Sequence, residues 1–241
     1  MYPRLMIHLP HLQENVNTVR TLCAAHGISI TGITKVFRGD PTIAQVLVDG
    51  GITMLGDSRV ANLARRAGER TGTPLSVISG GNSATIDLML RGGIPAGVNT
   101  LRLGESLLFG RERSNYQYLP GTHRDVFTLE CQSVEVKDKP SLPWGTVGVD
   151  SYGRKPEFVD RGLVRRKAVC ALGRQDFDAE TTTVLDPGVI LLGASSDHLM
   201  LDVTDSERDY QVGDVIRLQL GYFSTMRAFT SDYVEKVYLE D

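Results

Sequence analysis

A lysine at the end of an apolar run is the first residue here that could do chemistry. Lys35 closes the stretch "GITK" (32–35), and a glycine and an Asp-Pro pair follow soon after it. Such a lysine can be a surface side chain that keeps its charge in water, the partner of a buried carboxylate, or a reactive amine. The stretch by itself leaves these three interpretations open.

Two glycine-containing stretches, "SGGNSAT" (79–85) and "LRLGES" (101–106), add candidate binding residues. Each is typical of a strand that passes into a helix, where backbone N–H groups can hold a phosphate. A tight turn with a serine cap explains each stretch equally well on its own. Together with Lys35 they indicate a phosphorylated cofactor that reacts with an amine, and pyridoxal phosphate fits that description. The candidate residues from these stretches are Asn82, Ser83, Arg102 and Gly104.

The elements that must position these residues alternate between strand and helix patterns up to about residue 120. Apolar residues recur with helical spacing in some segments, and continuous apolar runs mark the others. The expected strands are 4–9, 28–37, 52–57, 74–81 and 98–104, and the expected helices are 10–27, 40–51, 58–72, 82–93 and 105–111. This alternation predicts a parallel sheet covered by helices, with ligands bound at the carboxyl ends of its strands.

From about residue 121 the pattern becomes rich in short strands separated by Gly, Pro and Asp. Stretches such as "DVFTLECQSVEVKDK" and "VIRLQLGYF" are typical of a mostly antiparallel β domain or barrel. We therefore predict an α/β domain over residues 1–120 and a β domain over residues 121–241.

The composition is that of an ordinary soluble protein, with 41% hydrophobic and 23% charged residues in a chain of 241. A net charge of −3 gives no reason to expect nucleic acid or an anionic membrane as a partner. Cys23, Cys131 and Cys170 are far apart and odd in number, and no cluster has metal-ligand spacing, so we expect neither disulfides nor zinc. The chain starts without a signal-peptide pattern, and a cytoplasmic location is expected.

The motifs resemble those of the alanine racemase-like, fold-type III pyridoxal phosphate enzymes, and most of all those of their ornithine racemase branch. The opening "RLMIHLPHLQENVNTVRTLCAAHGISITGITKVFRGDP" carries the resemblance first. Counterparts of further motifs follow in the same order: "SGGNSAT", "LRLGESLLFGR", "GTVGVDSYGRKPEF", "ALGRQDFD" and "LGASSDHLMLDVTDSERDYQVGD".

The resemblance implies a role for each candidate residue. The family's counterpart of Lys35 carries the cofactor as a Schiff base and is one of two racemisation bases. The counterparts of Asn82, Ser83, Gly104 and Glu105 surround the phosphate, mostly through backbone N–H groups. The counterpart of Arg102 faces the ring nitrogen, and because arginine keeps its proton, it leaves that nitrogen unprotonated.

Two departures concern the remaining active-site residues. The family's lysine motif continues with a tyrosine and a glycine, whereas this sequence has "KVFRG". The family's second base is a tyrosine from the partner subunit, and the matching stretch "GVDSYG" does not align residue for residue. Tyr152 is the preferred second base and Asp150 the alternative. The other interpretation of Tyr152 is a tyrosine in a surface turn without a catalytic role.

The side-chain amine of a basic amino-acid substrate needs a carboxylate partner. Asp197 and Asp176 are the candidates, and the other interpretation of each is a hydrogen-bonded turn residue.

The largest departure is the length of the α/β domain. A closed β/α barrel takes about 250 residues, whereas only about half of that precedes the β domain here. The family carries roughly four further β/α units between residues 71–75 and 76–81. We therefore expect a partial barrel, with strand 4–9 pairing with the β domain, that is either naturally short or derived from a longer parent.

The resulting hypothesis is a racemase for ornithine or another basic amino acid that works as a homodimer. The open edges of a four-stranded sheet favour an interface that includes residues 70–80. The alternatives are a pyridoxal phosphate-binding protein without catalysis, and an inactive remnant.

Overall fold

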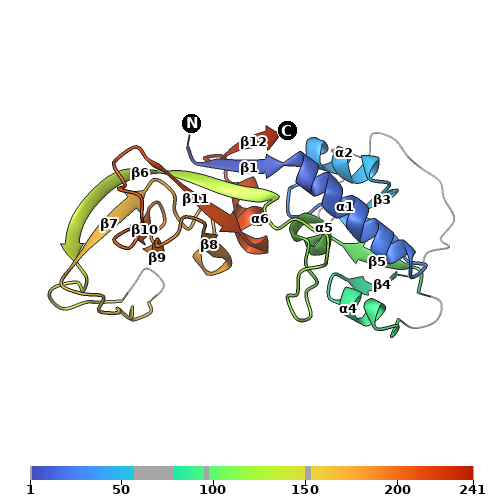
Figure 1. The fold of residues 1–241 in the computed structure, drawn as a ribbon, viewed down its shortest axis with the longest axis horizontal. Helices are drawn as coiled ribbons and strands as arrows, with labels where there is room; N and C mark the ends of the chain where they lie inside the picture. The colour runs from blue at the N-terminus through green and yellow to red at the C-terminus, as the bar shows by residue number, and fades with distance from the viewer. Residues whose placement is uncertain (1, 57–78, 95–97, 150–152, 241) are drawn as a thin grey trace.

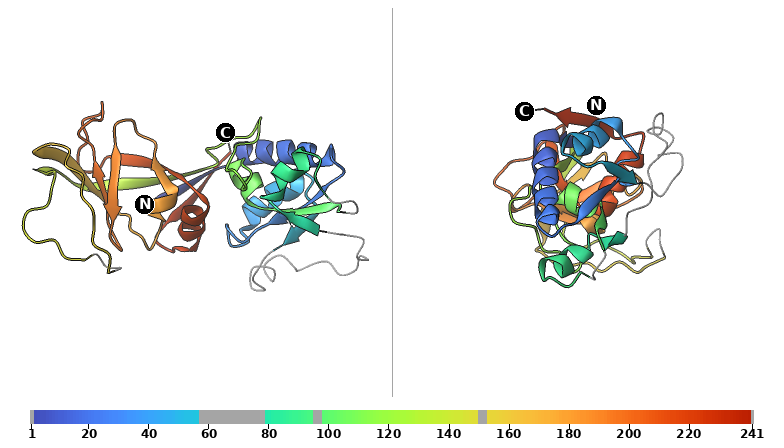
Figure 2. Two further views of the ribbon diagram at one scale, coloured as in Figure 1. Left: turned by 90° about the horizontal axis from the view of Figure 1, so that it is seen from below. Right: turned by 90° about the vertical axis from the view of Figure 1, so that its right-hand side faces the viewer.

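A computed structural model describes residues 2–56, 79–94, 98–149 and 153–240. The molecule is elongated, with two lobes side by side that are joined at a narrow waist (Figures 1 and 2). One lobe, the α/β lobe, holds a four-stranded sheet with helices α1, α2, α4 and α5. The other, the β lobe, holds an eight-stranded sheet and helix α6.

The sheet of the α/β lobe is parallel throughout and has the strand order β3-β2-β5-β4. Its strands are β2 (Ser29–Ile33), β3 (Met54–Gly56), β4 (Ser79–Asn82) and β5 (Thr100–Leu103). Strands β3 and β4 form its two edges, and the chain between them includes residues 57–78, outside the described part. Within the described residues, the lobe is therefore a partial barrel of four strands, as the sequence predicted, where a closed barrel has eight.

The helices of this lobe are α1 (Leu9–Ala24), α2 (Pro41–Asp49), α4 (Thr85–Leu90) and α5 (Glu105–Phe109). Helix α1 buries Leu12, Val16 and Val19, which recur at intervals of three and four residues. Helix α2 begins where Oδ1 of Asp40 accepts hydrogen bonds from two backbone N–H groups, at 3.0 and 3.2 Å. The helix expected at 58–72 lies outside the described residues.

The sheet of the β lobe includes β1 (Arg4–His8) from the start of the chain. This strand pairs antiparallel with β6 (Phe127–Pro140) and parallel with β12 (Glu235–Leu239). The other pairs are antiparallel. The remaining elements are β7 (Val164–Cys170), a 3₁₀ turn (Ala179–Thr181), β8 (Thr182–Val184), β9 (Ile190–Ala194), β10 (Leu199–Asp202), β11 (Val215–Leu220) and α6 (Tyr222–Thr230). The fold is thus a partial β/α barrel followed by a mostly antiparallel β domain, and the boundary near residue 120 stays a prediction.

Two elements differ from the sequence prediction at places that matter for the site. The strand expected over 28–37 ends at Ile33, so Lys35 lies in the following turn and not at the strand's end. The stretch "VIRLQLGYF" (215–223) is a strand only to Leu220, because helix α6 begins at Tyr222 and buries Ser224, Ala228 and Phe229 at helical spacing.

Among the described residues, no helix is both long and apolar enough to cross a membrane.

Candidate functional site

A cavity of about 640 Å³ opens at the carboxyl ends of the parallel strands. The α/β lobe supplies most of its lining, and one aromatic side chain comes from helix α6 of the β lobe. The lining residues are Thr31, Ile33, Lys35, Val36, Gly56, Asn82, Ser83, Ala84, Arg102, Gly104, Glu105, Arg113 and Tyr222. The structure therefore brings together Lys35 and the five predicted binding residues from three separate stretches of the sequence.

Lys35 is half-buried in the turn that follows β2, and its Nζ lies 5.6 Å from the centroid of the Tyr222 ring. The backbone N–H of Arg38 donates to the carbonyl of Lys35 at 3.3 Å, and Arg38 adopts a left-handed conformation with φ of 52°. The guanidinium of Arg38 donates in turn to the carbonyl of Phe229 at 3.3 Å. Because Phe229 belongs to α6, the turn that carries Lys35 is anchored to the β lobe.

The end of β4 and the loop that follows it present Asn82 and Ser83 to the cavity. Oδ1 of Asn82 accepts a hydrogen bond from the backbone N–H of Ala84 at 2.9 Å, which fixes the loop locally. The Ser83 hydroxyl is buried and lies 2.7 Å from that of Ser106. It also accepts from the backbone N–H of Ser106 at 3.2 Å. These contacts join the two glycine-containing stretches at their helix starts.

Arg102 lies in the middle of the sheet face that lines the cavity. Strand register pairs it with Thr31 of β2 and with Asn82 of β4. Side chains of paired residues point to the same face of a sheet, so the three form a row across it. Arg102 thereby places a permanent cation between two neutral polar side chains.

Glu105 lines the cavity, but its carboxylate is only 4% exposed and belongs to an ion-pair cluster. Arg111 donates to Oε1 through Nε and an Nη atom at 3.0 and 2.8 Å, and Arg113 reaches Oε2 at 3.4 Å. Arg113 also lines the cavity, and the sequence analysis did not select it. The sequence did contain a signal for Arg113. It is the basic pair in "GRER" (110–113), which comes shortly after the second glycine-containing stretch.

Tyr222 is another lining residue that was not selected from the sequence. It comes from α6, and its ring packs 6.3 Å from that of Phe109 on the α/β lobe. The sequence placed this tyrosine at the end of a strand, where nothing connects it with Lys35. Only the packing of the two lobes brings the pair together.

The two aspartates expected to contact substrate do not line this cavity. Asp176 is 3% exposed and accepts a hydrogen bond from the Ser231 hydroxyl at 2.6 Å. Asp197 is exposed in the turn between β9 and β10, where Gln175 donates to it at 3.1 Å. The candidate second bases, Asp150 and Tyr152, lie outside the described residues.

The segment that surrounds those two bases exposes large apolar side chains. Trp144 is 92% exposed and Leu163 is 94% exposed, and both lie in the long connection between β6 and β7. Val149 and Val159 in the same connection are also exposed. A concentration of large exposed apolar side chains in one connection is typical of a segment that another molecule covers.

No protein-family model matches the chain. Ornithine racemase of Acetoanaerobium sticklandii is 45% identical over 179 residues, which are 74% of this chain and 50% of the relative. This chain therefore spans about half the length of that racemase. Lysine racemase of Thermotoga maritima is 30% identical over 351 aligned positions, which cover 99% of both chains.

The alignment with the lysine racemase is longer than this chain of 241 residues, so a large stretch of that relative has no counterpart here. Among solved structures, alanine racemase from Bartonella henselae with covalently bound pyridoxal phosphate superimposes with a TM-score of 0.66 at 12% identity. That match covers 99% of this chain and 100% of the other. At this level of identity the likeness concerns the fold.

Proposed function

Because this chain belongs to the alanine racemase-like, fold-type III pyridoxal phosphate enzymes, near ornithine racemase, we propose that it is a pyridoxal phosphate-dependent amino-acid racemase. Ornithine or another basic amino acid is the proposed substrate, since the two curated relatives are named for ornithine and lysine. The observation that carries the proposal is the cavity that gathers Lys35, Ser83 and Arg102.

The residues of the cavity fit the chemistry of this cofactor. An aldehyde needs an amine, and Lys35 supplies one in a half-buried position. A phosphate needs cations and hydrogen-bond donors, and Arg113, Ser83 and Asn82 line the cavity together. The volume of about 640 Å³ lies within the range of ordinary cofactor sites. Lys35 would hold the aldehyde carbon, and the loop with Asn82 and Ser83 would hold the phosphate.

When bound, pyridoxal phosphate would stabilise negative charge on the Cα atom of the amino acid. The amine of Lys35 would remove or return the Cα proton on one face. Arg102 would face the ring nitrogen and, as a group that does not give up its proton, would donate a hydrogen bond without protonating that nitrogen. An unprotonated ring would withdraw electrons from Cα less strongly than a protonated one. This favours simple return of the proton to Cα over other reactions, which suits a racemase.

Inversion of configuration needs a second base on the opposite face of Cα. Tyr152 is the proposed second base and Asp150 the alternative, both supplied by a partner chain in a homodimer. Two observations support a partner: the exposed apolar side chains around this segment, such as Trp144, and the unpaired edges β3 and β4 among the described strands. The predicted contact at residues 70–80 lies almost entirely outside the described part of the chain.

Asp176 and Asp197 remain the proposed partners for the side-chain amine of a basic substrate. Since neither lines the cavity of its own chain, such a contact would be made in the partner's cavity. Asp197 is exposed and so is the better placed of the two for this role.

The test is to incubate the purified chain with pyridoxal phosphate and enantiopure ornithine in deuterated water. We expect racemisation together with exchange of the Cα hydrogen, and Lys35→Ala should abolish both. If the wild-type chain shows neither inversion nor exchange with ornithine or lysine, racemase activity of this chain is refuted.

A second candidate is a pyridoxal phosphate-binding protein without catalysis, favoured by the fact that the chain spans about half of the ornithine racemase. It predicts visible absorbance of the lysine-bound cofactor that disappears in Lys35→Ala, with no turnover. An inactive remnant predicts no absorbance with added cofactor. We also propose a cytoplasmic location, with which the three free, buried cysteines are compatible.

A further inference from the structure

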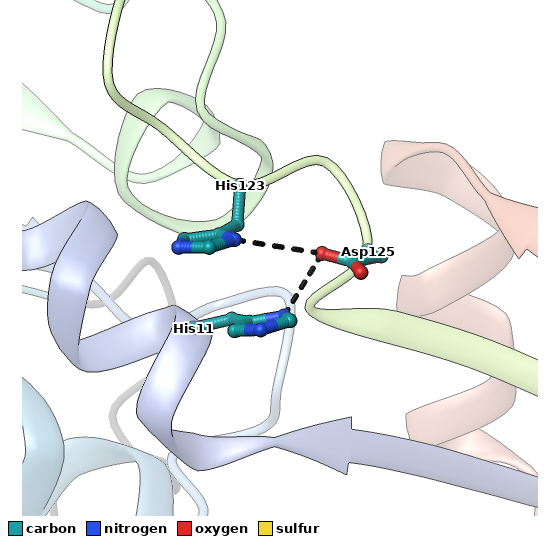
Figure 3. Close-up of side chains that lie close together, drawn as sticks. All are labelled: His11, His123 and Asp125. Carbon is teal, nitrogen blue, oxygen red and sulfur yellow. Dashed lines mark ion pairs between the residues drawn. The ribbon is translucent and has the colours of Figure 1, made fainter.

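Three imidazole rings lie face to face at the waist between the two lobes. The ring of His11 lies 3.5 Å from that of His8 and 3.9 Å from that of His123, with interplanar angles of 9° and 6°. Figure 3 shows Asp125 beside two of these rings. Its Oδ1 lies 2.9 Å from Nδ1 of His11 and 3.9 Å from Nδ1 of His123.

Nδ1 of His11 is buried and makes no hydrogen bond, and Oδ1 of Asp125 lies 2.9 Å from it, a contact that is an ion pair only when the histidine is protonated. A metal ion that accepts electron pairs from this nitrogen and from the carboxylate oxygen would bind both groups.

We propose that His11, His123 and Asp125 form a binding site for one divalent transition-metal ion of the zinc type. Imidazole nitrogen and carboxylate oxygen bind zinc at about 2.0–2.2 Å, which places ligand atoms about 3.3 Å apart around a tetrahedral ion. The three ligand atoms here all lie within 4.8 Å of one another. Because the rings of His11 and His123 are stacked nearly parallel, they would have to tilt towards one another to bring both nitrogens onto one ion, and water would complete its coordination.

The choice of metal follows from the donor atoms. Two imidazole nitrogens and one carboxylate oxygen favour zinc, nickel, cobalt or copper over magnesium and calcium, which prefer all-oxygen sites. The side chains of His11, His123 and Asp125 are 24%, 33% and 60% exposed, so water reaches the cluster although Nδ1 of His11 is itself buried.

Neighbouring side chains hold His123 in place and direct its Nδ1 towards Asp125. Oε2 of Glu14 lies 2.5 Å from Nε2 of His123, which turns Nδ1 towards Asp125. A carboxylate on the second ring nitrogen is the usual support of a metal-binding histidine. The side chain of Asn15, which is fully buried, exchanges two hydrogen bonds with the backbone of His123, at 3.0 and 2.5 Å.

The position in the fold gives the ion a structural role. His11 lies in the first turn of α1, just after the connection from β1, and His123 with Asp125 precedes β6. These are the two places where the chain passes between the lobes. A bound ion would tie both connections together, away from the Lys35 cavity, which none of the three residues lines.

The test is to titrate the full-length chain with Zn²⁺ by calorimetry and with Co²⁺ by visible absorption. We expect one ion per chain. The variants His123→Gln and Asp125→Asn should each weaken binding at least about tenfold, and Glu14→Gln about tenfold, as for other supporting carboxylates. Circular dichroism checks that the variants fold, which is expected because Asn15 holds residue 123 through its backbone.

Two control variants make the result specific. His26→Gln changes an exposed histidine just beyond the other end of α1 and should leave binding unchanged. Lys35→Ala should also leave it unchanged, which separates this site from any chelation by the cofactor and from the proposed activity. The proposal is wrong if the wild type binds neither ion, if His123→Gln and Asp125→Asn bind as the wild type does, or if His26→Gln weakens binding as much as they do.

Discussion

The Nζ atom of Lys35 lies 5.6 Å from the centre of the Tyr222 ring, although the two residues belong to different lobes. Lys35 follows β2 of the parallel sheet, and Tyr222 begins α6 of the β lobe. An ammonium group at this distance from an aromatic ring is attracted to it. The contact closes one side of the cavity and makes the position of the amine depend on how the lobes pack.

Replacing Tyr222 should therefore weaken cofactor binding. In Tyr222→Ala we expect the affinity for pyridoxal phosphate to fall about tenfold, since an aromatic contact contributes roughly 0.5–1.5 kcal/mol. Tyr222→Phe keeps the ring and should stay close to the wild type. The measurement is a titration of visible absorbance, and equal losses in both variants would show that the hydroxyl, not the ring, matters.

Gly81 should tolerate no side chain, because its φ of 147° suits only glycine and an added Cβ would lie 2.0 Å from Oγ1 of Thr85. That oxygen accepts a hydrogen bond from the backbone N–H of Asn82. We expect Gly81→Ala to cost about 3 kcal/mol of unfolding free energy. The matched control is Gly92→Ala, which has positive φ but open space and should cost about 1 kcal/mol. Urea denaturation measures both, and equal costs would refute the steric argument.

Neutralising Glu105 should destabilise the fold, because its carboxylate is buried between Arg111 and Arg113. In Glu105→Gln we expect a loss of about 2 kcal/mol, the size of charged hydrogen bonds that are removed. A double-mutant cycle with Arg111→Met should show that most of this loss belongs to that pair. Additive losses in the cycle would contradict the assignment.

Acid should weaken the β lobe through Asp202, which is buried and lies 2.8 Å from Nε of Arg165. Burial by itself would raise the pKa of Asp202, but hydrogen bonds from Arg165 and Thr204 outweigh it and hold the pKa below its ordinary value. A carboxyl with a lowered pKa in the folded state adds stability above the unfolded pKa of about 3.9, and this is lost as the pH falls further.

The corresponding measurement is the unfolding free energy at neutral pH and at several values below pH ~4. Asp202→Asn should be less stable than the wild type at neutral pH, and the difference should shrink with acidification. A difference that stays constant at every pH would show that Asp202 does not contribute through its charge.

The exposed apolar side chains between β6 and β7 should hold a dimer together. We expect Trp144→Ser combined with Leu163→Ser to raise the dimer dissociation constant more than about tenfold, because each buried large apolar side chain contributes roughly 1.5–3 kcal/mol. Tyr233→Ser, at another exposed aromatic residue of the β lobe, is the control. Sedimentation over a concentration series measures the constant, and a folded wild-type monomer at all concentrations would refute the dimer.

The sequence by itself was enough for the family, for the alternating α/β and β-rich halves, and for the residues of two strand-to-helix loops. For the elements and loops the reason is local, because glycine-containing turns and apolar residues at periods of two or 3.6 indicate loops, strands and helices without long-range information. Lys35, Ser83 and Arg102 could be selected in this way, because each lies at or next to the end of a predicted strand. The family was identified by the resemblance of its motifs to known ones.

Tertiary structure decided which side chains from distant segments meet. Tyr222 reaches Lys35 only because α6 packs against the α/β lobe. The stretch "LGYF", in which α6 begins directly after a strand, contains no local pattern that predicts this contact. His11 and Asp125 lie far apart in the chain, so no spacing rule could pair them. Periodicity reports on neighbours along the chain, whereas these contacts depend on how two lobes meet at the waist, which is set by long-range packing.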